Sequence, residues 1–538
     1  MLVVGAGING AVSASCMAAR GARVALIDRG DFAGHTSQSS SNLAWGGIKY
    51  LESFEFGLVA KLCASRNHLL RNFPSSVKEI RFFVAHEPTF RHGRIKLFLG
   101  SLLYWAIGWF FTKAPRLLSK SAIEREEPVV RAALTDGGFE YSDAYLHDND
   151  ARFVWTFVRR ALDEGAACAN YIELVSAVRE GDLWVARLRC ALSGREWDLR
   201  AKTLVNTAGP YSDELGERIG IRTKHTHAFS KGIHLIVPRV TRSQRVLTFF
   251  ADDGRLFFAI PMGARTCIGT TDTRVAEPEA FVTPEDRRFV LENINKRLQL
   301  PKPLTEADII SERCGVRPLA TERGEGSSRD WMQMSRKHVV EVAPDQASVA
   351  IFGGKLTDCV NVGEEVARAV GSLGVSYPRP LAAWYGEPDD SIKQSFFAEA
   401  ERIKLDDYTA PTSAEPLSER LWRRYGKRAF ELLKYIEHDA REAQLVFEGA
   451  EHIHVELGHA DRHEMITKLE DFLRRRTKVA MVMSEQQLAR SPGVREAARV
   501  FFGARADAEL RDTFGDLFSA ANAAPSPAAQ AYVPASDS

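Results

Sequence analysis

A glycine-rich turn within the first 30 residues restricts the fold of this chain more than any other feature. Gly5, Gly7 and Gly10 follow a short apolar run, and the small residues of 9–20 predict a helix directly behind them. Residues 23–28 (RVALID) then read as a second buried strand. The order of strand, glycine turn, helix and strand is typical of the beginning of a dinucleotide-binding fold.

Each glycine of this turn has a separate physical role. The first allows the tight turn, the second lets the backbone approach a pyrophosphate, and the third permits close packing of helix and strand. The amides and dipole at the N-terminus of the helix favour an anion. Asp28 ends the second strand, where its carboxylate can accept hydrogen bonds from a ribose. The segment therefore predicts a dinucleotide site, with a purely structural turn as the alternative.

Two later turns distinguish FAD from NAD as the dinucleotide. Ala208 and Gly209 follow an apolar strand and resemble the turn that flavoproteins of this fold carry there. Gly353 and Gly354 again follow a strand and precede a helix, at a position suited to approach a flavin ring. Any one of these turns can be structural, but three of them in this order would encircle one extended cofactor. We therefore expect FAD.

Length and charge narrow the class of protein further. A chain of 538 residues is expected to form two or three domains. Its formal charge of +1 and the lack of a binding motif argue against a nucleic-acid partner. The seven cysteines are scattered without a CxxC pair, which predicts neither disulfides nor zinc and favours a reducing compartment. No signal peptide precedes the turn, and we expect a cytoplasmic protein.

The pattern of elements predicts an α/β fold with three domains. A Rossmann-like FAD-binding domain is interleaved with an antiparallel-sheet substrate domain and followed by a C-terminal all-α domain. The predicted boundaries are 1–80, 145–215 and 349–376 for FAD binding, 81–144 and 216–348 for the substrate domain, 389–519 for the helical domain and 520–538 for a disordered tail. The clearest helix of the last domain is expected at 464–481, with an apolar stripe of Met465, Leu469, Phe472 and Leu473.

An uncharged segment at 97–111 has two interpretations. It is shorter than the about 20 residues that a membrane-spanning helix needs. Basic residues flank it on both sides, and it contains Tyr104, Trp105 and Trp109, as an interfacial helix does. A helix buried on all sides in the core is the alternative. We mark 95–116 as a membrane-facing candidate.

Several motifs together resemble the FAD-dependent (respiratory) glycerol-3-phosphate dehydrogenases, among the D-amino-acid-oxidase-like flavoproteins. The resemblance extends from the first glycine turn to about residue 480. The motifs that carry it are residues 5–10, 37–43 (SQSSSNL), 46–52 (GGIKYLE), 231–234 (KGIH), 268–272 (IGTTD), 315–319 (GVRPL), 353–357 (GGKLT) and the segment 462–473.

The resemblance implies oxidation of sn-glycerol 3-phosphate to dihydroxyacetone phosphate, with hydride passing to flavin N5 and electrons to a membrane quinone. It also implies peripheral association with the inner leaflet of the cytoplasmic membrane, and a homodimer is a further expectation. Arg317 stands in the family's substrate-binding motif, and the family places the histidine equivalent to His234 at the substrate. Arg317 would clamp the phosphate, and Lys355 would add a point charge. The alternatives are a structural salt bridge for Arg317, a backbone contact for Lys355 and a core position for His234.

The candidate residues form three groups. The catalytic candidates are His234, Arg317 and Lys355. The substrate-binding candidates are Lys49, Tyr50, His234, Thr271, Arg317 and Lys355. The cofactor-binding candidates are Gly5, Gly7, Ile8, Asn9, Gly10, Asp28, Arg29, Ser37, Ser41, Asn42, Leu43, Gly46, Gly47, Ala208, Gly209, Gly353, Gly354, Lys355, Leu356 and Thr357.

The sequence departs from the family at three places. Lys49 replaces the usual arginine, which keeps the charge and loses the two-pronged fork. Asp358, Cys359 and Val360 stand where the family continues with Thr, Tyr and Arg. The first strand is also shorter than in relatives. Three alternatives therefore stay open, namely another polyol phosphate such as a tetritol phosphate, an oxidase that uses oxygen, and a catalytically inactive flavin-binding module at the membrane.

No metal site is expected from the sequence. The histidine pairs at 225 and 227, at 452 and 454, and at 459 and 463 each lack a third ligand at a helpful spacing. The nucleophile motif GxSxG, the Walker motif and HExxH are also absent from the sequence.

Overall fold

The N-terminal strand β1 (Leu2–Val4) lies within a six-stranded sheet of the computed structural model, which describes residues 1–269, 271–324, 337–411 and 413–523. It pairs in parallel with β2 (Ala25–Ile27) and with β11 (Leu204–Asn206). The sheet continues through β7 (Ala167–Ala169) at one edge and through β19 (Ser348–Phe352) to the antiparallel β18 (Val339–Ala343) at the other. Strand β18 therefore forms an edge of the six-stranded sheet, whereas residues 339–343 were predicted from the sequence to belong to the substrate domain.

Helix α1 (Ile8–Ala19) is held between two other helices on this sheet. It contacts α5 (Asp150–Asp163) and α8 (Cys359–Ser372), and every residue of α1 from position 10 onward is buried. Because α1 consists largely of alanine, glycine and serine, neighbouring elements approach it closely. This packing fixes the glycine turn at the carboxyl end of β1.

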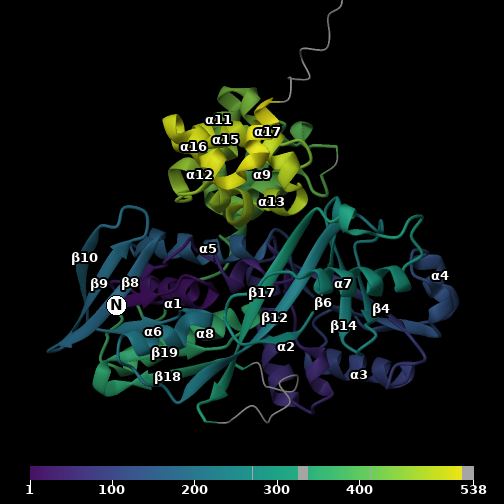
Figure 1. Ribbon diagram of the computed structural model, residues 1–538, viewed down its shortest axis with the longest axis horizontal. Helices are drawn as coiled ribbons and strands as arrows, with labels where there is room; N and C mark the ends of the chain where they lie inside the picture. The colour runs from purple at the N-terminus through teal and green to yellow at the C-terminus, as the bar shows by residue number, and fades with distance from the viewer. Residues whose placement is uncertain (270, 325–336, 412, 524–538) are drawn as a thin grey trace, which may run out of the picture.

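A second, mostly antiparallel sheet of ten strands forms the substrate part of the molecule (Figure 1). Its path is β16-β12-β15-β14-β13-β4-β6-β3, with β17 paired to β12 and β5 paired to β6. The strands are β3 (Leu43–Ala44), β4 (Val77–His86), β5 (Arg116–Leu118), β6 (Gly137–Leu146), β12 (His225–Pro238), β13 (Val246–Phe250), β14 (Leu256–Met262), β15 (Arg265–Gly269), β16 (Thr273–Val275) and β17 (Ser311–Glu322). The long β12–β17 ladder places Ser230 opposite Arg317 and His234 opposite Arg313.

Smaller elements complete the two sheet regions. A three-stranded sheet is formed by β8 (Ile172–Glu180), β9 (Leu183–Cys190) and β10 (Glu196–Ala201). The remaining helices of these regions are α2 (Phe56–Asn72), α3 (Arg94–Ile107), α4 (Lys120–Glu126), α6 (Ser212–Arg218) and α7 (Pro284–Arg297). The predicted α/β class with an antiparallel-sheet substrate region is therefore confirmed.

The C-terminal part of the chain is helical, as expected, and lies on one side of both sheets (Figure 1). Its helices are α9 (Asp390–Arg402), α10 (Leu417–Tyr425), α11 (Ala429–His438), α12 (His454–His463), α13 (Val479–Val482), α14 (Glu485–Arg490), α15 (Pro492–Phe502), α16 (Ala506–Phe514) and α17 (Asp516–Ala523). Four residues assigned to the disordered tail, 520–523, belong to α17, and residues 524–538 lie outside the described part of the chain.

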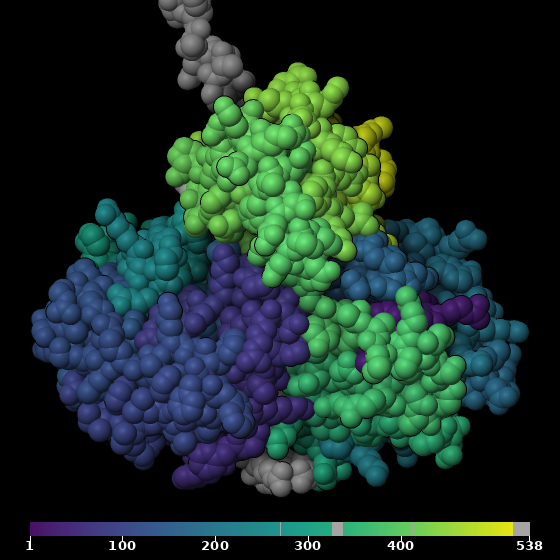
Figure 2. Space-filling view, turned by 180° about the vertical axis from the view of Figure 1, so that it is seen from behind, coloured from purple at the N-terminus to yellow at the C-terminus, as the bar shows by residue number. Residues whose placement is uncertain are grey.

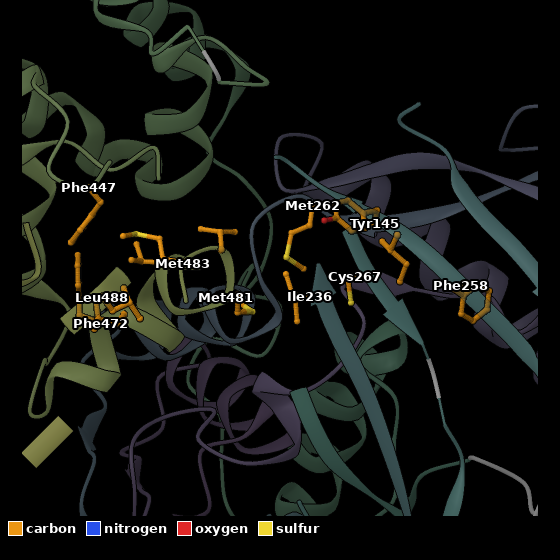
Figure 3. Close-up of a cluster of buried hydrophobic side chains, with 14 of the residues drawn as sticks. Tyr145, Ile236, Phe258, Met262, Cys267, Phe447, Phe472, Met481, Met483 and Leu488 are labelled. Carbon is orange, nitrogen blue, oxygen red and sulfur yellow. The ribbon is translucent and has the colours of Figure 1, made fainter. Parts of the chain in front are cut away.

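One hydrophobic core joins the helical part to the ten-stranded sheet. Phe472 and Met481 belong to the same buried cluster as Ile236 and Cys267 of the sheet. Figure 3 shows Met481 between the side chains of the two regions. The helical part is therefore packed against the substrate sheet through apolar side chains.

The prediction of one long helix at 464–481 is wrong. Glu464 ends α12, Met465 has a left-handed φ of 52°, and helical structure resumes only as the short π-helical turn η12 (Asp471–Arg476) and α13. The apolar stripe divides accordingly, because Leu469, Phe472 and Leu473 enter one core cluster and Met465 packs against another. The Asp471 carboxylate accepts hydrogen bonds from the amides of residues 467 and 468 and so starts a separate turn.

The interpretation of segment 97–111 as a helix buried on all sides is also wrong. Most of it lies in α3, which buries Ser101 and Tyr104 and exposes apolar side chains on its outer face. Leu99 is 57% exposed, and Trp109, just beyond the helix, is 80% exposed. Within the described residues, no helix is both long and apolar enough to cross a membrane.

Candidate active site

The first glycine turn leaves no room for side chains. Gly5 has φ +99°, and a Cβ atom added there would lie 2.6 Å from the carbonyl oxygen of Thr207. A Cβ atom added at Gly10 would lie 1.8 Å from the Gly5 carbonyl oxygen. Both collisions are with backbone atoms, which cannot swing aside as a flexible side chain does. The turn therefore requires glycine at both positions.

The N-terminus of α1 is suited to an anion. Gly7 precedes the helix without a side chain that could cap it, and the first turn holds no acidic residue. Ser37 from the polar loop reaches this end, where its Oγ accepts the Ile8 amide at 3.0 Å. Amides and the dipole at a helix N-terminus stabilise phosphate groups. The arrangement fits the pyrophosphate of a dinucleotide.

Asp28 lies at the end of β2 beside this turn. Its carboxylate accepts the Ala6 amide at 2.6 Å and the Gly30 amide at 2.9 Å. Burial raises the pKa of Asp28 to about 6, although both amides and Arg29 act in the opposite direction. Each carboxylate oxygen can accept a second hydrogen bond, so Asp28 can also bind a ribose hydroxyl. The neighbouring Arg29 guanidinium lies 3.8 Å from the centroid of the Tyr211 ring.

The structure brings the three predicted turns together. The Thr207 hydroxyl, next to Ala208 and Gly209, donates to the Gly5 carbonyl at 2.7 Å. From α1, the Asn9 amide nitrogen donates to the Gly353 carbonyl at 3.1 Å. Gly209, Gly353 and Gly354 all have positive φ. Contacts between residues more than 200 positions apart thus connect the turns as one cofactor site requires.

The polar loop at 37–47 has a structural part and a part that faces the turns. The Asn42 side chain donates to the carbonyls of Leu146 and Asp148 and accepts from Arg313, and these contacts hold the loop in place. Leu43 is the first residue of β3. Arg313 donates hydrogen bonds to Ser40 and Asn42, the two residues on either side of Ser41. Gly46 donates its amide to Asp143 at 3.0 Å, and Gly47 has φ +83°.

Two lysines gather around one aromatic ring. The Lys355 ammonium lies 4.2 Å from the centroid of the Tyr50 ring, and the Lys49 ammonium lies 5.7 Å from it. Thr357, two residues after Lys355, donates to the Trp45 carbonyl at 3.2 Å, which ties the third turn to the loop. Leu356 begins the short helical turn η8 (Leu356–Asp358). The cluster supplies two positive charges that a phosphate can share.

A second cluster forms on the β12–β17 ladder. His234 is buried on β12, and neither ring nitrogen has a hydrogen-bond partner in the part of the chain that the structure describes. Burial, and then the charges of Arg313 and Arg317, lower the pKa of His234 to about 3, so the ring is neutral. The Arg317 guanidinium donates to the Thr271 carbonyl at 3.4 Å. Since buried polar atoms are nearly always paired in native proteins, His234 points to a ligand.

Gly232 and Arg313 also shape this cluster, and neither was predicted from the sequence as a site residue. A Cβ atom added at Gly232 would lie 2.1 Å from Arg317 Nη2, so glycine leaves the space that the guanidinium fills. Arg313, which faces His234 in the β12–β17 register, is fully buried and donates to Asn42 Oδ1 at 2.7 Å. Gly232 belongs to the motif at 231–234, so the sequence could have identified it as a site residue. Only the strand register reveals Arg313.

The carboxylate that departs from the family pattern is held inside the protein. Asp358 accepts hydrogen bonds from Ser65 at 2.7 Å and from Asn361 at 2.6 Å. It also pairs with His338 at 3.1 Å and with Lys61 at 3.3 Å. Despite burial, these partners, His338 first, lower the pKa of Asp358. The negative charge of Asp358 is therefore compensated by Lys61 of α2 and by His338.

Comparisons with known proteins agree with this arrangement. The family described as FAD dependent oxidoreductase matches residues 1–334, and the C-terminal domain of alpha-glycerophosphate oxidase matches residues 390–504. The chain is 31% identical over 502 residues to a glycerol-3-phosphate dehydrogenase of Pseudomonas aeruginosa, which covers 91% of this chain and 93% of the relative. It is 29% identical to the aerobic glycerol-3-phosphate dehydrogenase of Escherichia coli, which covers 91% and 96%, respectively.

Solved structures show the same fold. The glycerol-3-phosphate dehydrogenase from Bacillus halodurans complexed with FAD aligns with a TM-score of 0.72 at 23% identity, covering 97% of this chain and 94% of that one. Glycine oxidase from Geobacillus kaustophilus aligns with a TM-score of 0.51 at 17% identity, covering 70% and 95%. The second alignment covers less of this chain, and both similarities concern the fold.

Proposed function

Since this chain belongs to the FAD-dependent oxidoreductases, within the glycerol-3-phosphate dehydrogenase family, we propose that it oxidises sn-glycerol 3-phosphate to dihydroxyacetone phosphate. We further propose that the electrons leave to a membrane quinone. The observation that carries the proposal is His234, a buried neutral imidazole without a hydrogen-bond partner among the described residues, beside the charge of Arg317.

The cofactor is FAD, which supplies the oxidant that accepts a hydride equivalent from the substrate carbon. The glycine positions at which an added Cβ would collide with backbone fit such a group, because they let the chain approach it closely. The turn around Gly7 would hold the pyrophosphate, and Asp28 would hold a ribose hydroxyl. The backbone of Gly353 and Gly354 would face the flavin end.

A phosphorylated polyol suits the positive charges of the site. A phosphate monoester carries close to two negative charges at neutral pH. Arg317 offers a planar fork for it, and Lys49 and Lys355 offer point charges around Tyr50. Arg317 lies 3.5 Å from Asp272, so phosphate would compete with that carboxylate for the guanidinium. We propose Arg317 as the main phosphate ligand.

His234 is the proposed acceptor of the proton from the C2 hydroxyl. An unprotonated ring nitrogen can accept a hydrogen bond from this hydroxyl and take its proton as the carbon is oxidised. Two arginine charges help to lower the pKa of His234 in the free protein. A bound phosphate dianion offsets part of that positive charge and raises the pKa, which makes the imidazole a better base when substrate is present.

The proposed membrane surface is centred on the outer face of α3. Exposed apolar side chains of this patch are Phe54, Phe56, Ile95, Leu99, Leu103, Trp109, Phe110 and Phe111. Basic residues flank it, with Arg91 and Lys96 on one side and Lys113 on the other. Figures 1 and 2 show this dark blue part of the chain away from the C-terminal helices at the top. Apolar side chains with a basic rim favour an anionic lipid surface. We therefore propose peripheral association with the inner face of the cytoplasmic membrane.

A steady-state substrate and acceptor panel tests the proposal. The FAD-loaded protein is assayed with sn-glycerol 3-phosphate, a tetritol phosphate and unphosphorylated glycerol, each with a quinone analogue or with oxygen as acceptor. We expect dihydroxyacetone phosphate as product, with the quinone analogue reduced and little hydrogen peroxide released. A preference for the tetritol phosphate would overturn the substrate assignment, and fast peroxide release would overturn the acceptor. A protein that binds FAD and turns over none of them would support a binding module.

A further inference from the structure

A group of three potential metal ligands lies in the C-terminal helical part, separate from the residues discussed above. His459 and His463 stand four residues apart on α12, so their side chains share one face of the helix. Glu431 lies on α11, which packs against α12. From the sequence no metal site was expected at His459 and His463, because the third potential ligand comes from another helix.

The geometry brings the three side chains to a common point. One potential ligand atom from each of the three residues lies within 4.8 Å of the other two. His463 Nε2 is 3.6 Å from Glu431 Oε2, and the centroids of the two imidazole rings are 4.9 Å apart. Ligand atoms around a tetrahedral ion with bonds of about 2.0–2.1 Å are about 3.3 Å apart. Binding an ion would therefore draw the ligand atoms together by up to about 1.5 Å from the 4.8 Å limit.

His459 shows why this group suits a ligand. Its side chain is only 3% exposed, and its Nδ1 atom has no hydrogen-bond partner among the residues that the structure describes. His463 Nε2 is likewise buried without a hydrogen bond in the described part of the chain, and its longer contact is with Glu431. Unpaired buried nitrogens are rare in native structures, and a metal ion would satisfy both at once.

The groups around His459 leave its imidazole able to bind a ligand. The Arg152 guanidinium, whose charge acts on His459, is paired with the buried Glu464 at 2.5 Å. The Tyr425 ring packs edge-on against His459 at 4.7 Å and holds the plane of the imidazole. Glu431 is the carboxylate member of the group and supplies its negative charge.

We propose that Glu431, His459 and His463 bind one divalent transition-metal ion of the zinc type, which links α11 to α12. Two imidazoles and one carboxylate form a donor set that Zn²⁺ prefers, with a fourth position left for water. Glu431 and His463 are partly exposed, so an ion can enter from solvent. Because the ligands belong to two helices, the bound ion stabilises the helical part of the chain.

The test uses the full-length, FAD-loaded protein without an affinity tag. Zn²⁺ is titrated by calorimetry into metal-free wild type and into the variants Glu431→Gln, His463→Ala and His454→Ala. The last is a matched control, because His454 lies on α12 with the two histidines, pairs instead with Glu496 of α15 at 2.7 Å, and is not part of the three-residue group. Co²⁺ is added in parallel, and its visible absorption reports tetrahedral coordination by nitrogen and oxygen.

We expect one Zn²⁺ per chain for wild type and for His454→Ala. Glu431→Gln and His463→Ala should weaken binding by at least about 10-fold. A Zn²⁺ concentration about 100 times the Kd should raise the Tm of wild type by on the order of 5 °C and that of His463→Ala much less. FAD content and substrate turnover without metal should stay at the wild-type level in all three variants, which shows that the fold is intact.

Two results would overturn the proposal. One is the absence of stoichiometric Zn²⁺ or Co²⁺ binding by wild type. The other is an equal loss of binding in His454→Ala and His463→Ala, which would mean that the ion occupies a different surface position. Because no activity measurement enters either result, the test is independent of the proposed enzymatic function.

Discussion

The space at Gly232 offers a sharp way to move Arg317 without removing it. A Cβ atom added at Gly232 would lie 2.1 Å from Arg317 Nη2 and 2.4 Å from its Nη1. Both atoms are at the far end of a flexible side chain, so Gly232→Ala should displace the guanidinium and leave the β12–β17 backbone in place. The variant therefore moves the positive charge of Arg317 and keeps the charge itself.

The size of the displacement follows from contact distances. An ordinary contact for an added Cβ begins at 3.4 Å, so the guanidinium must retreat by about 1.3 Å from its 2.1 Å position. A misplacement of about 1 Å at a substrate ligand costs about 100-fold in catalytic efficiency. This corresponds to about 2.7 kcal/mol of transition-state stabilisation. We expect Gly232→Ala to lower kcat/KM for sn-glycerol 3-phosphate by this factor.

The assay compares kcat/KM, FAD content and Tm of Gly232→Ala with those of wild type and of Gly458→Ala. A Cβ atom at Gly458 also meets an arginine end, Arg462 Nη1, but at an ordinary 3.4 Å and within a helix, where alanine is tolerated. Gly458→Ala should therefore match or exceed the wild type in Tm and match it in activity. A kcat/KM within threefold of wild type for FAD-loaded Gly232→Ala would refute the assignment of Arg317 as phosphate ligand.

Four further predictions concern Asp28, the outer face of α3 and the first glycine turn. FAD affinity should fall as the pH falls through about 6, because a protonated Asp28 carboxyl is a weaker hydrogen-bond acceptor for the ribose hydroxyl, and Asp28→Asn should remove this dependence, as measured by flavin fluorescence. The same raised pKa means that Asp28 contributes stability to the apoprotein below its unfolded-state pKa of 3.8, and this contribution is lost as the pH rises through about 6. Leu99→Asp with Leu103→Asp should abolish sedimentation with anionic vesicles, whereas Leu192→Asp, also at an exposed leucine, should not; equal sedimentation of both proteins would contradict the membrane surface. Gly10→Ala should be colourless after purification, because its Cβ would meet backbone at 1.8 Å, and a yellow variant would contradict the turn geometry.

The parts of the fold that depend on local backbone rules were predictable from the sequence. Glycines with a fixed spacing between apolar strands leave few alternatives, so β1, α1 and β2 lie where expected, and the prediction of FAD is confirmed. The later turns were recognised for the same reason. The assignment of individual site residues stays a prediction.

The failures arose where distant charges override local periodicity. The stripe at 464–481 predicted one helix, but Asp31 pairs with Arg475 and Arg476 across more than 440 positions of sequence. Those buried pairs, together with the left-handed Met465, fix a broken path that an apolar pattern does not reveal. For the same reason the sequence did not point to Glu431 as a proposed metal ligand, because α11 is brought next to α12 by the tertiary fold.

The exposed face of α3 illustrates a different limit. An uncharged run fits a core helix and an interfacial helix equally well, because the sequence does not show which side has a protein neighbour. In the structure, Tyr104 turns inward and donates to Asp143 at 2.7 Å, while Leu99 and Leu103 face outward. Since Asp143 also accepts the Gly46 amide, the inner side of α3 is joined to the loop that carries Lys49 and Tyr50.

Anaerobic titration of the flavin absorbance tests the proposed reaction most directly, because it needs no electron acceptor. FAD-loaded wild type is mixed with sn-glycerol 3-phosphate under nitrogen, and Arg317→Ala is treated in the same way. The account predicts that the yellow absorbance of wild type bleaches with about one equivalent of substrate, that dihydroxyacetone phosphate forms, and that Arg317→Ala bleaches only at far higher substrate concentration. A wild-type flavin that stays oxidised with sn-glycerol 3-phosphate, or bleaches only with a tetritol phosphate, would contradict the account.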